Sequence, residues 1–121
     1  MATQPGQIFR SFAQSSLALC ILLQPLIGFS NPLPRIVSLS PHLTEMVYAA
    51  GAADHLVGTV EYSDYPMAAL SIPRIGDSFR LDYEALALLQ PDIVLVWGSG
   101  NPIEMQNKLR SLGYNVVAQE P

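Results

Sequence analysis

The stretch "DIVLVW", Asp92 to Trp97, decides the fold that this sequence predicts. Five consecutive apolar residues follow the aspartate, and no polar residue interrupts them. A continuous apolar run of this length is typical of a strand that is buried on both faces, as in a parallel sheet covered by helices. The segments on either side should therefore alternate between helix and strand.

The residues after this run predict a turn, a helix and a last strand. We interpret the turn, "GSGN", as a strand-to-helix connection rather than a phosphate cradle, because two glycines alone are a weak signal for phosphate. Asn101 as N-cap, Pro102 at the first helical position and Glu104 match a capping box. The apolar stripe of this helix is predicted to be Met105, Leu109 and Leu112, with Gly113 as its end. "YNVVAQ" then predicts a strand.

The residues before the run predict more strands and helices in alternation. Ser40 is suited to be an N-cap before Pro41, and Asp82 can cap a second, short helix. A further short strand in "IPRIGD" is limited by Pro73, which cannot donate a hydrogen bond to a neighbouring strand. We expect strands at 36–39 and 55–60, and helices at 41–50 and 83–90.

Strands that alternate with helices form right-handed crossovers. We therefore predict an α/β fold with a mainly parallel sheet and helices on both faces, a Rossmann-like single lobe. Ligands of such sheets bind outside the carboxyl ends of the strands. The segments that leave those ends are "SLSPHL", "EYSDYP", "GDSFRLD" and "WGSGN", and we expect a binding site along this edge.

The first thirty residues have the order of a secretory signal peptide. Residues 1–16 are polar with one cation, Arg10, and the apolar run "LALCILLQPLIGF" follows. Small residues at Gly28 and Ser30 then suit a cleavage site. We interpret residues 1–30 as a signal peptide, which predicts a secreted, periplasmic protein.

Two alternatives to a signal peptide are weaker. A membrane anchor needs about 20 apolar residues, and Pro25 interrupts this run. A lipoprotein signal at Cys20 would require a small residue where Leu19 stands, and most of the apolar run lies after the cysteine.

The composition of residues 31–121 excludes several classes of function. This part has five lysine and arginine residues against ten carboxylates, a net charge of −5, which disfavours nucleic-acid binding. The single cysteine, Cys20, lies in the predicted signal peptide. The remaining chain has no disulfide, no cysteine metal site and no thiol nucleophile.

Motifs for catalysis are also missing from the sequence. Ser40 and His42 are close in sequence, but there is no G-x-S-x-G motif for a hydrolase. No G-x-G-x-x-G follows the first predicted strand, so a dinucleotide cofactor is not expected. His42 and His55 lack metal-ligand spacing. We predict neither an enzyme nor a metal site.

Aromatic side chains fit a binding function better. Tyr62, Tyr65, Phe79 and Trp97 can all lie at the carboxyl edge of the sheet, where they would offer broad apolar faces with polar groups attached. Such a surface suits a flat, amphipathic ligand. The alternative is that Phe79 and Trp97 are ordinary core residues.

The order of motifs resembles a known family. "RIVSLSPHLTEMVYAAGAADHLVG", "YSDYP", "LALLQPDIVLVW" and "LRSLGYNV" together resemble the N-terminal lobe of the periplasmic substrate-binding proteins of ABC importers. The likeness is to the class with two lobes joined by one rigid helix, and within it to the cobalamin binders. It covers residues 35 to about 119, so we expect residues 31–121 to be one lobe, with the connecting helix and second lobe absent.

The resemblance implies roles for individual residues. Tyr62 and Tyr65 would contact the corrin ring, and Trp97 would line the same cleft. A further aromatic of the cobalamin binders aligns with Ser78, with Phe79 one position away. Glu84 stands where the family has a glutamate that docks with the permease, although the helix dipole alone would favour a carboxylate there. The partners implied are a corrinoid, an ABC importer permease and its ATPase.

Charge separates the ligands of this class. Haem and most ferric siderophores are anionic and would want cations at the edge, whereas the loop offers Glu61 and Asp64. A corrin fringed with neutral amides tolerates these acids; Arg74 and Arg80 weaken this reasoning without reversing it. We expect cobalamin or a related corrinoid as the ligand. The alternatives are haem, a ferric siderophore, or a ligand-free α/β adaptor to a membrane protein.

Overall fold

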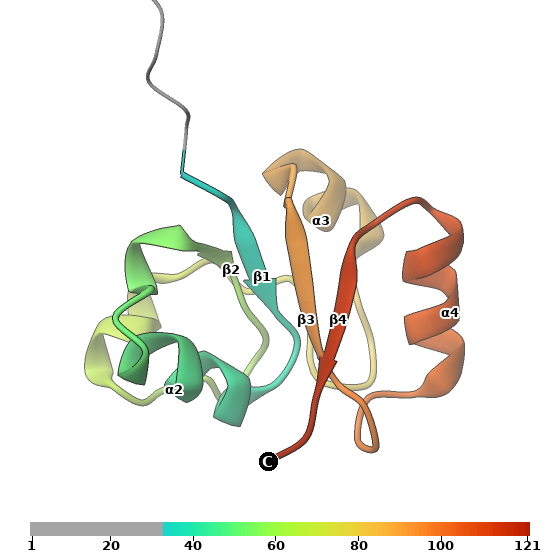
Figure 1. Ribbon diagram of the computed structural model, residues 1–121. Helices are drawn as coiled ribbons and strands as arrows, with labels where there is room; N and C mark the ends of the chain where they lie inside the picture. Colours follow the sequence, from blue (N-terminus) through green and yellow to red (C-terminus); the bar gives the residue numbers. More distant parts are fainter. Residues whose placement is uncertain (1–32) are drawn as a thin grey trace, which may run out of the picture. The chain divides into compact units, whose positions relative to one another are not determined.

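The computed structural model describes residues 33–121, so the expected signal peptide at 1–30 lies outside the described part. A parallel sheet with the order β2-β1-β3-β4 forms the centre of this part (Figure 1). Its four strands are β1 (Ile36–Ser38), β2 (Leu56–Gly58), β3 (Ile93–Trp97) and β4 (Val116–Gln119).

The apolar run of "DIVLVW" forms β3, a central strand of the sheet. β3 pairs with β1 on one side and with β4 on the other, in registers that place Ile93 beside Ile36 and Val94 beside Val116. Along β3 the burial alternates: Val94 and Val96 are fully buried, while their neighbours are half-buried. The strand therefore faces a packed core on one side and a thinner cover on the other.

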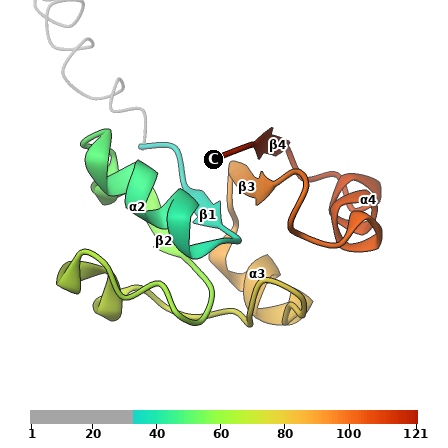
Figure 2. The same ribbon diagram turned by 90° about the horizontal axis from the view of Figure 1, so that it is seen from below.

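Three α-helices connect the strands. They are α2 (Pro41–Ala49), α3 (Tyr83–Leu89) and α4 (Ile103–Ser111), with short 3-10 helices η2 (Ala53–His55) and η3 (Met67–Ser71). Figure 2 shows α2 on one face of the sheet and both α3 and α4 on the other. The predicted parallel sheet with helices on both faces is confirmed. Within residues 33–121, no helix is both long and apolar enough to cross a membrane.

The core lies between the sheet and the pair α3 and α4. Its buried members come from strands, helices and the segment after β2, and they are Val37, Leu39, Val60, Ile75, Leu86, Val94, Val96, Met105 and Leu109. Burial of such side chains stabilises a fold by about 1.5–3 kcal/mol each. A single layer of apolar contacts therefore holds both helices on this face.

The strand expected in "IPRIGD" is not formed. Thr59 and Arg74 make one isolated parallel bridge, and Gly76 and Leu81 make one isolated antiparallel bridge. Pro73 has no N–H to extend the pairing, and its carbonyl accepts from the Thr59 N–H at 2.9 Å. Further backbone bonds, from Ile75 N–H to the Thr59 carbonyl at 2.9 Å and from Glu61 N–H to the Gly76 carbonyl at 2.8 Å, hold this segment beside the residues that follow β2 without forming a regular strand.

The expected capping box at Asn101 is wrong. The N-cap of α4 is Pro102, and Asn101 is buried one residue earlier. Its side-chain Oδ1 accepts from the backbone N–H of Trp97 at 2.6 Å. Its Nδ2 donates to the backbone carbonyls of Leu39 at 2.9 Å and Ser78 at 2.8 Å. Asn101 therefore joins the end of β1, the end of β3 and the loop before α3.

Other details of the predicted helices are partly confirmed. Asp82 caps α3 by accepting from the N–H groups of Glu84 and Ala85, as predicted. Ser40 is the N-cap of α2 by its extended backbone, but its side chain makes no cap bond. Leu112 does not belong to the apolar stripe of α4, because the helix ends at Ser111 and Leu112 is 55% exposed.

We predict that Asn101→Ala lowers the free energy of unfolding by roughly 3 kcal/mol, because it removes three hydrogen bonds and leaves buried backbone groups without partners. Urea unfolding followed by circular dichroism measures this loss. Asn107→Ala, at an exposed position of α4, is the matched control and should change the free energy by less than about 0.5 kcal/mol. Equal effects of the two changes would contradict the role of Asn101.

Candidate ligand-binding edge

The sheet has a point where consecutive connections turn to opposite faces. β1 is followed by α2, and β3, its neighbour in the sheet, is followed by α4 on the other face (Figures 1 and 2). The loops that follow the carboxyl ends of β1 and β3 therefore lead to opposite faces of the sheet. Ligands of open α/β sheets bind at such a point.

His42 and Trp97 meet at this point. His42 lies in the first turn of α2 and Trp97 is the last residue of β3. Their ring centroids are 5.1 Å apart and their planes are at 87°, an edge-to-face contact. Nδ1 of His42 is 2.5 Å from Oγ of Ser40. Both rings are half-buried, so Trp97 is neither an ordinary core residue nor a fully exposed one.

The turn after β3 is shaped around the indole of Trp97. A Cβ at Gly100 would overlap the six-membered ring of Trp97, so only glycine leaves room for it there. The Asn101 side chain accepts from the backbone N–H of Trp97, and the Trp97 carbonyl accepts from the backbone N–H of Asn101 at 2.9 Å. Gly100 of "GSGN" thus serves to place a side chain.

The loop "EYSDYP" presents both of its tyrosines to solvent. Tyr62 is 80% exposed and Tyr65 is 71% exposed, whereas Ser63 between them is buried. Tyr62 has a φ of 69°, a left-handed conformation that is uncommon for residues other than glycine. The loop therefore turns its rings outward and one hydroxyl inward.

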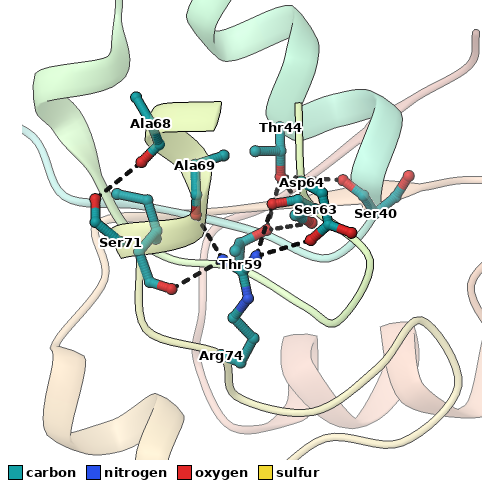
Figure 3. A network of polar contacts seen from close by, with 10 residues as sticks. Ser40, Thr44, Thr59, Ser63, Asp64, Ala68, Ala69, Ser71 and Arg74 are labelled. Atoms are coloured by element: carbon teal, nitrogen blue, oxygen red, sulfur yellow. Dashed lines mark hydrogen bonds and ion pairs between the residues drawn. The ribbon is translucent and has the colours of Figure 1, made fainter. Parts of the chain in front are cut away.

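That inward hydroxyl joins a buried cluster under the loop (Figure 3). Thr59 Oγ1 donates to Ser63 Oγ at 2.9 Å and lies 2.7 Å from Thr44 Oγ1. Thr44 also donates to Ser38 Oγ at 3.1 Å. All four side chains are buried. The cluster ties the loop to β1, to α2 and to the end of β2.

Arg74 supports the same loop from the other side, as Figure 3 shows. Its guanidinium donates to the carbonyls of Ser63 at 2.7 Å, Ala69 at 2.6 Å and Ile72 at 2.9 Å, and it lies 3.4 Å from Asp64. Only 17% of the Arg74 side chain is exposed. The cation is therefore used to hold the loop and is not presented to a ligand.

A hollow of about 450 Å³ lies between the loop "EYSDYP" and α2. It is lined by His42, Glu45, Met46, Ala49, Tyr65 and Pro121. Tyr65 and His42 share this hollow, and His42 contacts Trp97. The structure thus brings Tyr65 and Trp97 to one region through His42.

Ser78 and Phe79 are only partly associated with this region. The Ser78 carbonyl is bound by Asn101, which also binds Trp97. Phe79 is 68% exposed and is not core. It lines a separate hollow of about 350 Å³ together with Arg80, Leu81, Tyr83, Pro102, Glu104, Met105 and Lys108.

Glu84 lies in the first turn of α3 and is exposed. Its N–H is bound by Asp82 at 3.1 Å, and its carboxylate is free to face solvent. Among residues 33–121, no three histidine, cysteine or acidic side chains are placed so that they could hold a metal ion.

Sequence reasoning missed the residues that support this edge. Thr59, Ser63 and Asn101 hold the loops, and Arg74 was considered only as a charge. One signal was present in the sequence: Ser63 is small and uncharged between two large aromatic residues and two acids, which favours an inward side chain at that position.

Comparison with known sequences identifies similar proteins. The family model described as "Periplasmic binding protein" matches residues 36–121. A vitamin B12-binding protein of Vibrio cholerae is 45% identical over 85 residues, which are 70% of this chain and 31% of the relative. A vitamin B12-binding protein of Yersinia pseudotuberculosis is 35% identical over 104 residues, 86% of this chain and 37% of the relative. The chain spans about a third of the length of these relatives.

Solved structures share the fold. The crystal structure of the periplasmic vitamin B12-binding protein BtuF of Vibrio cholerae matches with a TM-score of 0.68 and 43% identity over 74% of this chain and 36% of that one. The periplasmic heme-binding protein RhuT from Roseiflexus matches with a TM-score of 0.64 and 30% identity over 70% of this chain and 33% of that one.

We predict that Gly100→Ala moves the Trp97 ring and shifts its fluorescence emission to longer wavelength, because the new Cβ overlaps the indole. The chain has one tryptophan, so the emission reports this ring alone. Gly98→Ala is the matched control, since its Cβ meets only the flexible end of Glu120. The role of Gly100 is wrong if its variant leaves the emission unchanged.

We predict that Arg74→Met lowers the free energy of unfolding by roughly 2 kcal/mol, because three carbonyls lose their donor while the aliphatic stem is kept. Hydrogen exchange at the amides of residues 61–65 should become faster, with little change in β3. Arg80→Met, at an exposed position, provides the comparison. Unchanged exchange in the loop would show that Arg74 does not hold it.

Proposed function

The chain belongs to the periplasmic binding protein family, and on that premise we propose that it forms one lobe of a binding protein that captures vitamin B12 or a related corrinoid for an ABC importer. The resemblance drawn from the sequence is confirmed by the family match and by the relatives. The family also supports a binding component rather than an enzyme.

The identity to vitamin B12-binding proteins carries the choice of ligand. It reaches 45% with the relative from Vibrio cholerae, whereas the heme-binding protein from Roseiflexus is 30% identical. Both comparisons cover 70% of this chain, so the difference does not come from a shorter match. A corrinoid is the better-supported ligand.

The chemistry of the edge agrees with a neutral, flat ligand. Exposed Tyr62 and Tyr65 offer ring faces. Tyr65 lines the hollow beside α2, and half-buried Trp97 contacts His42 of the same hollow. Glu61 and Asp64 are exposed and acidic. The cation in this loop region, Arg74, is bonded to backbone carbonyls. Anionic ligands would meet acids here and few free cations, which favours a ligand fringed with amides.

The remaining assignments follow from the same proposal. Residues 1–30 would direct export to the periplasm, where the matched structures are described as residing. Glu84, exposed in the first turn of α3, would dock with the importer permease. The importer ATPase would act from the other side of the membrane. Ser78 and Phe79 would contact the ligand from the loop before α3.

One alternative ligand has specific support, and one alternative function would need no ligand. Haem-binding proteins share the fold at a TM-score of 0.64, so haem or a ferric siderophore is the second candidate within the family. A ligand-free adaptor would use Glu84 and its exposed neighbours and would not need the aromatic loop.

A hybrid protein, in which this chain replaces the matching part of a full-length relative, tests the proposed ligand. The matching segment of the Vibrio cholerae vitamin B12-binding protein is replaced by residues 36–121 of this chain, and the hybrid is titrated calorimetrically with cyanocobalamin. We expect binding, and we expect Tyr62→Ala and Trp97→Ala each to weaken it roughly 10-fold, since buried aromatic contacts of this kind contribute about 1–3 kcal/mol. This chain by itself should bind weakly, because one lobe covers one side of the ligand.

Leu88→Ala is the control for these variants, because Leu88 is an apolar side chain of α3 that is 84% exposed. It should leave the affinity unchanged. A folded hybrid that binds haemin and not cyanocobalamin would replace the corrinoid by haem. A folded hybrid that binds neither would favour the adaptor. Nanomolar binding of cyanocobalamin by the chain alone would contradict the two-lobed picture.

A further inference from the structure

Two buried ring nitrogens lack a hydrogen-bond partner within residues 33–121. They are Nε2 of His42 and Nε1 of Trp97. The two rings that carry them are in edge-to-face contact, with centroids 5.1 Å apart. Both residues stand at the point where the connections after β1 and β3 turn to opposite faces. The unpaired atoms therefore coincide with the predicted position of the ligand.

Unpaired buried polar atoms are rare and costly in native proteins. Other buried polar side chains nearby do have hydrogen-bond partners. Asn101 uses both its amide oxygen and its amide nitrogen, and the buried hydroxyls of Thr44 and Thr59 are bonded to each other. Two unmatched nitrogens in such a region point to partners supplied by another molecule.

The chemistry of the two nitrogens restricts what that molecule can offer. The indole Nε1–H of Trp97 can only donate a hydrogen bond. His42 shares a hydrogen bond with Ser40 through Nδ1, and Nε2 donates or accepts according to the tautomer. A primary carboxamide carries a carbonyl oxygen and an NH₂ group side by side. It satisfies the indole with its oxygen and satisfies Nε2 in either tautomer.

We propose that His42 and Trp97 together bind a neutral primary carboxamide of the ligand, which makes His42 a specificity-determining residue of the site. The inference rests on the proposed function, because a corrin ring is fringed with such amides. A carboxylate fits less well, since it has no N–H for an accepting Nε2 and since Glu45 lines the same hollow as His42.

The amide reaches the pair from the hollow beside α2. His42 lines that hollow and is half-buried, but its Nε2 is buried, so the proposal requires the imidazole to turn toward the hollow when the amide binds. In this arrangement the amide would lie between the imidazole and the indole and would contact Trp97 Nε1. Binding therefore changes the surroundings of the indole N–H.

A purely structural role for His42 predicts different behaviour. In that case the ring contact alone matters, an N–H facing an aromatic ring is a weak bond, and phenylalanine at position 42 would serve as well as histidine. A role in amide binding requires a polar atom near Nε2, which glutamine supplies and phenylalanine does not.

The experiment uses the single tryptophan of the chain as its reporter. The ¹⁵N-labelled chain is titrated with acetamide and, separately, with acetate, and the indole N–H resonance is followed by NMR. We expect the resonance to shift with acetamide and to shift several-fold less with acetate. The response to acetamide should be lost in His42→Phe and partly kept in His42→Gln. Circular dichroism confirms that each variant is folded.

His55→Gln is the matched control, because His55 lies at the amino end of β2 and bonds to the Pro34 carbonyl, whereas His42 and Trp97 lie at the carboxyl ends of the strands. It should respond like the unchanged chain. An equal response in His42→Phe, an equal response to acetate, or no response to acetamide would each overturn the proposal.

Titration with cyanocobalamin in the hybrid separates this inference from the proposed function. We expect His42→Phe to weaken binding about 5- to 10-fold, the effect of one hydrogen bond, and His42→Gln to weaken it less. Cyanocobalamin binding that is insensitive to His42 overturns the inference and leaves the function standing. A response to acetamide without cyanocobalamin binding supports the amide site and overturns the corrinoid.

Discussion

The carboxamide of Asn101 is the contact on which the binding edge depends. It bonds to Leu39, 62 residues earlier, to Ser78, 23 residues earlier, and to Trp97 at the end of β3. Parallel strands place their carboxyl ends together, but they leave the following loops without shared hydrogen bonds. A single buried side chain supplies those bonds here, and it fixes the backbone from which Trp97 projects.

A second set of polar contacts fixes the tyrosine loop by the same means. Buried hydroxyls hold Ser63 from within the lobe, and Arg74 binds the Ser63 carbonyl from the side of η3. The polar groups of Ser63 are thereby bonded within the protein, while the rings of Tyr62 and Tyr65 face solvent. The position of Tyr62 and Tyr65 is therefore set by the buried bonds of Ser63, which lies between them.

Patterns of apolar residues predicted the architecture because burial is a property of whole segments. "DIVLVW" and the Pro, Asp and Gly signals around the helices placed the strands and α3 within a few residues. Side-chain polar contacts between distant segments leave no such periodic pattern. Asn101 before a proline fits the sequence rule for an N-cap, although the N-cap of α4 is Pro102 and Asn101 bonds to other segments. The isolated bridge between Thr59 and Arg74 is too short to produce a sequence pattern. The order of the predicted strands placed Tyr62, Tyr65 and Trp97 after the carboxyl ends of strands. It did not predict the hydrogen bonds that hold the backbone beneath these residues.

The separation between anchoring groups and outward rings has an evolutionary consequence. Exposed positions such as Tyr62, Tyr65 and Phe79 contribute little to the packed core, so they can be exchanged without repacking the lobe. The anchors beneath them must be kept together. Proteins described as vitamin B12-binding and as heme-binding share this fold, so one frame of buried anchors is compatible with different exposed side chains.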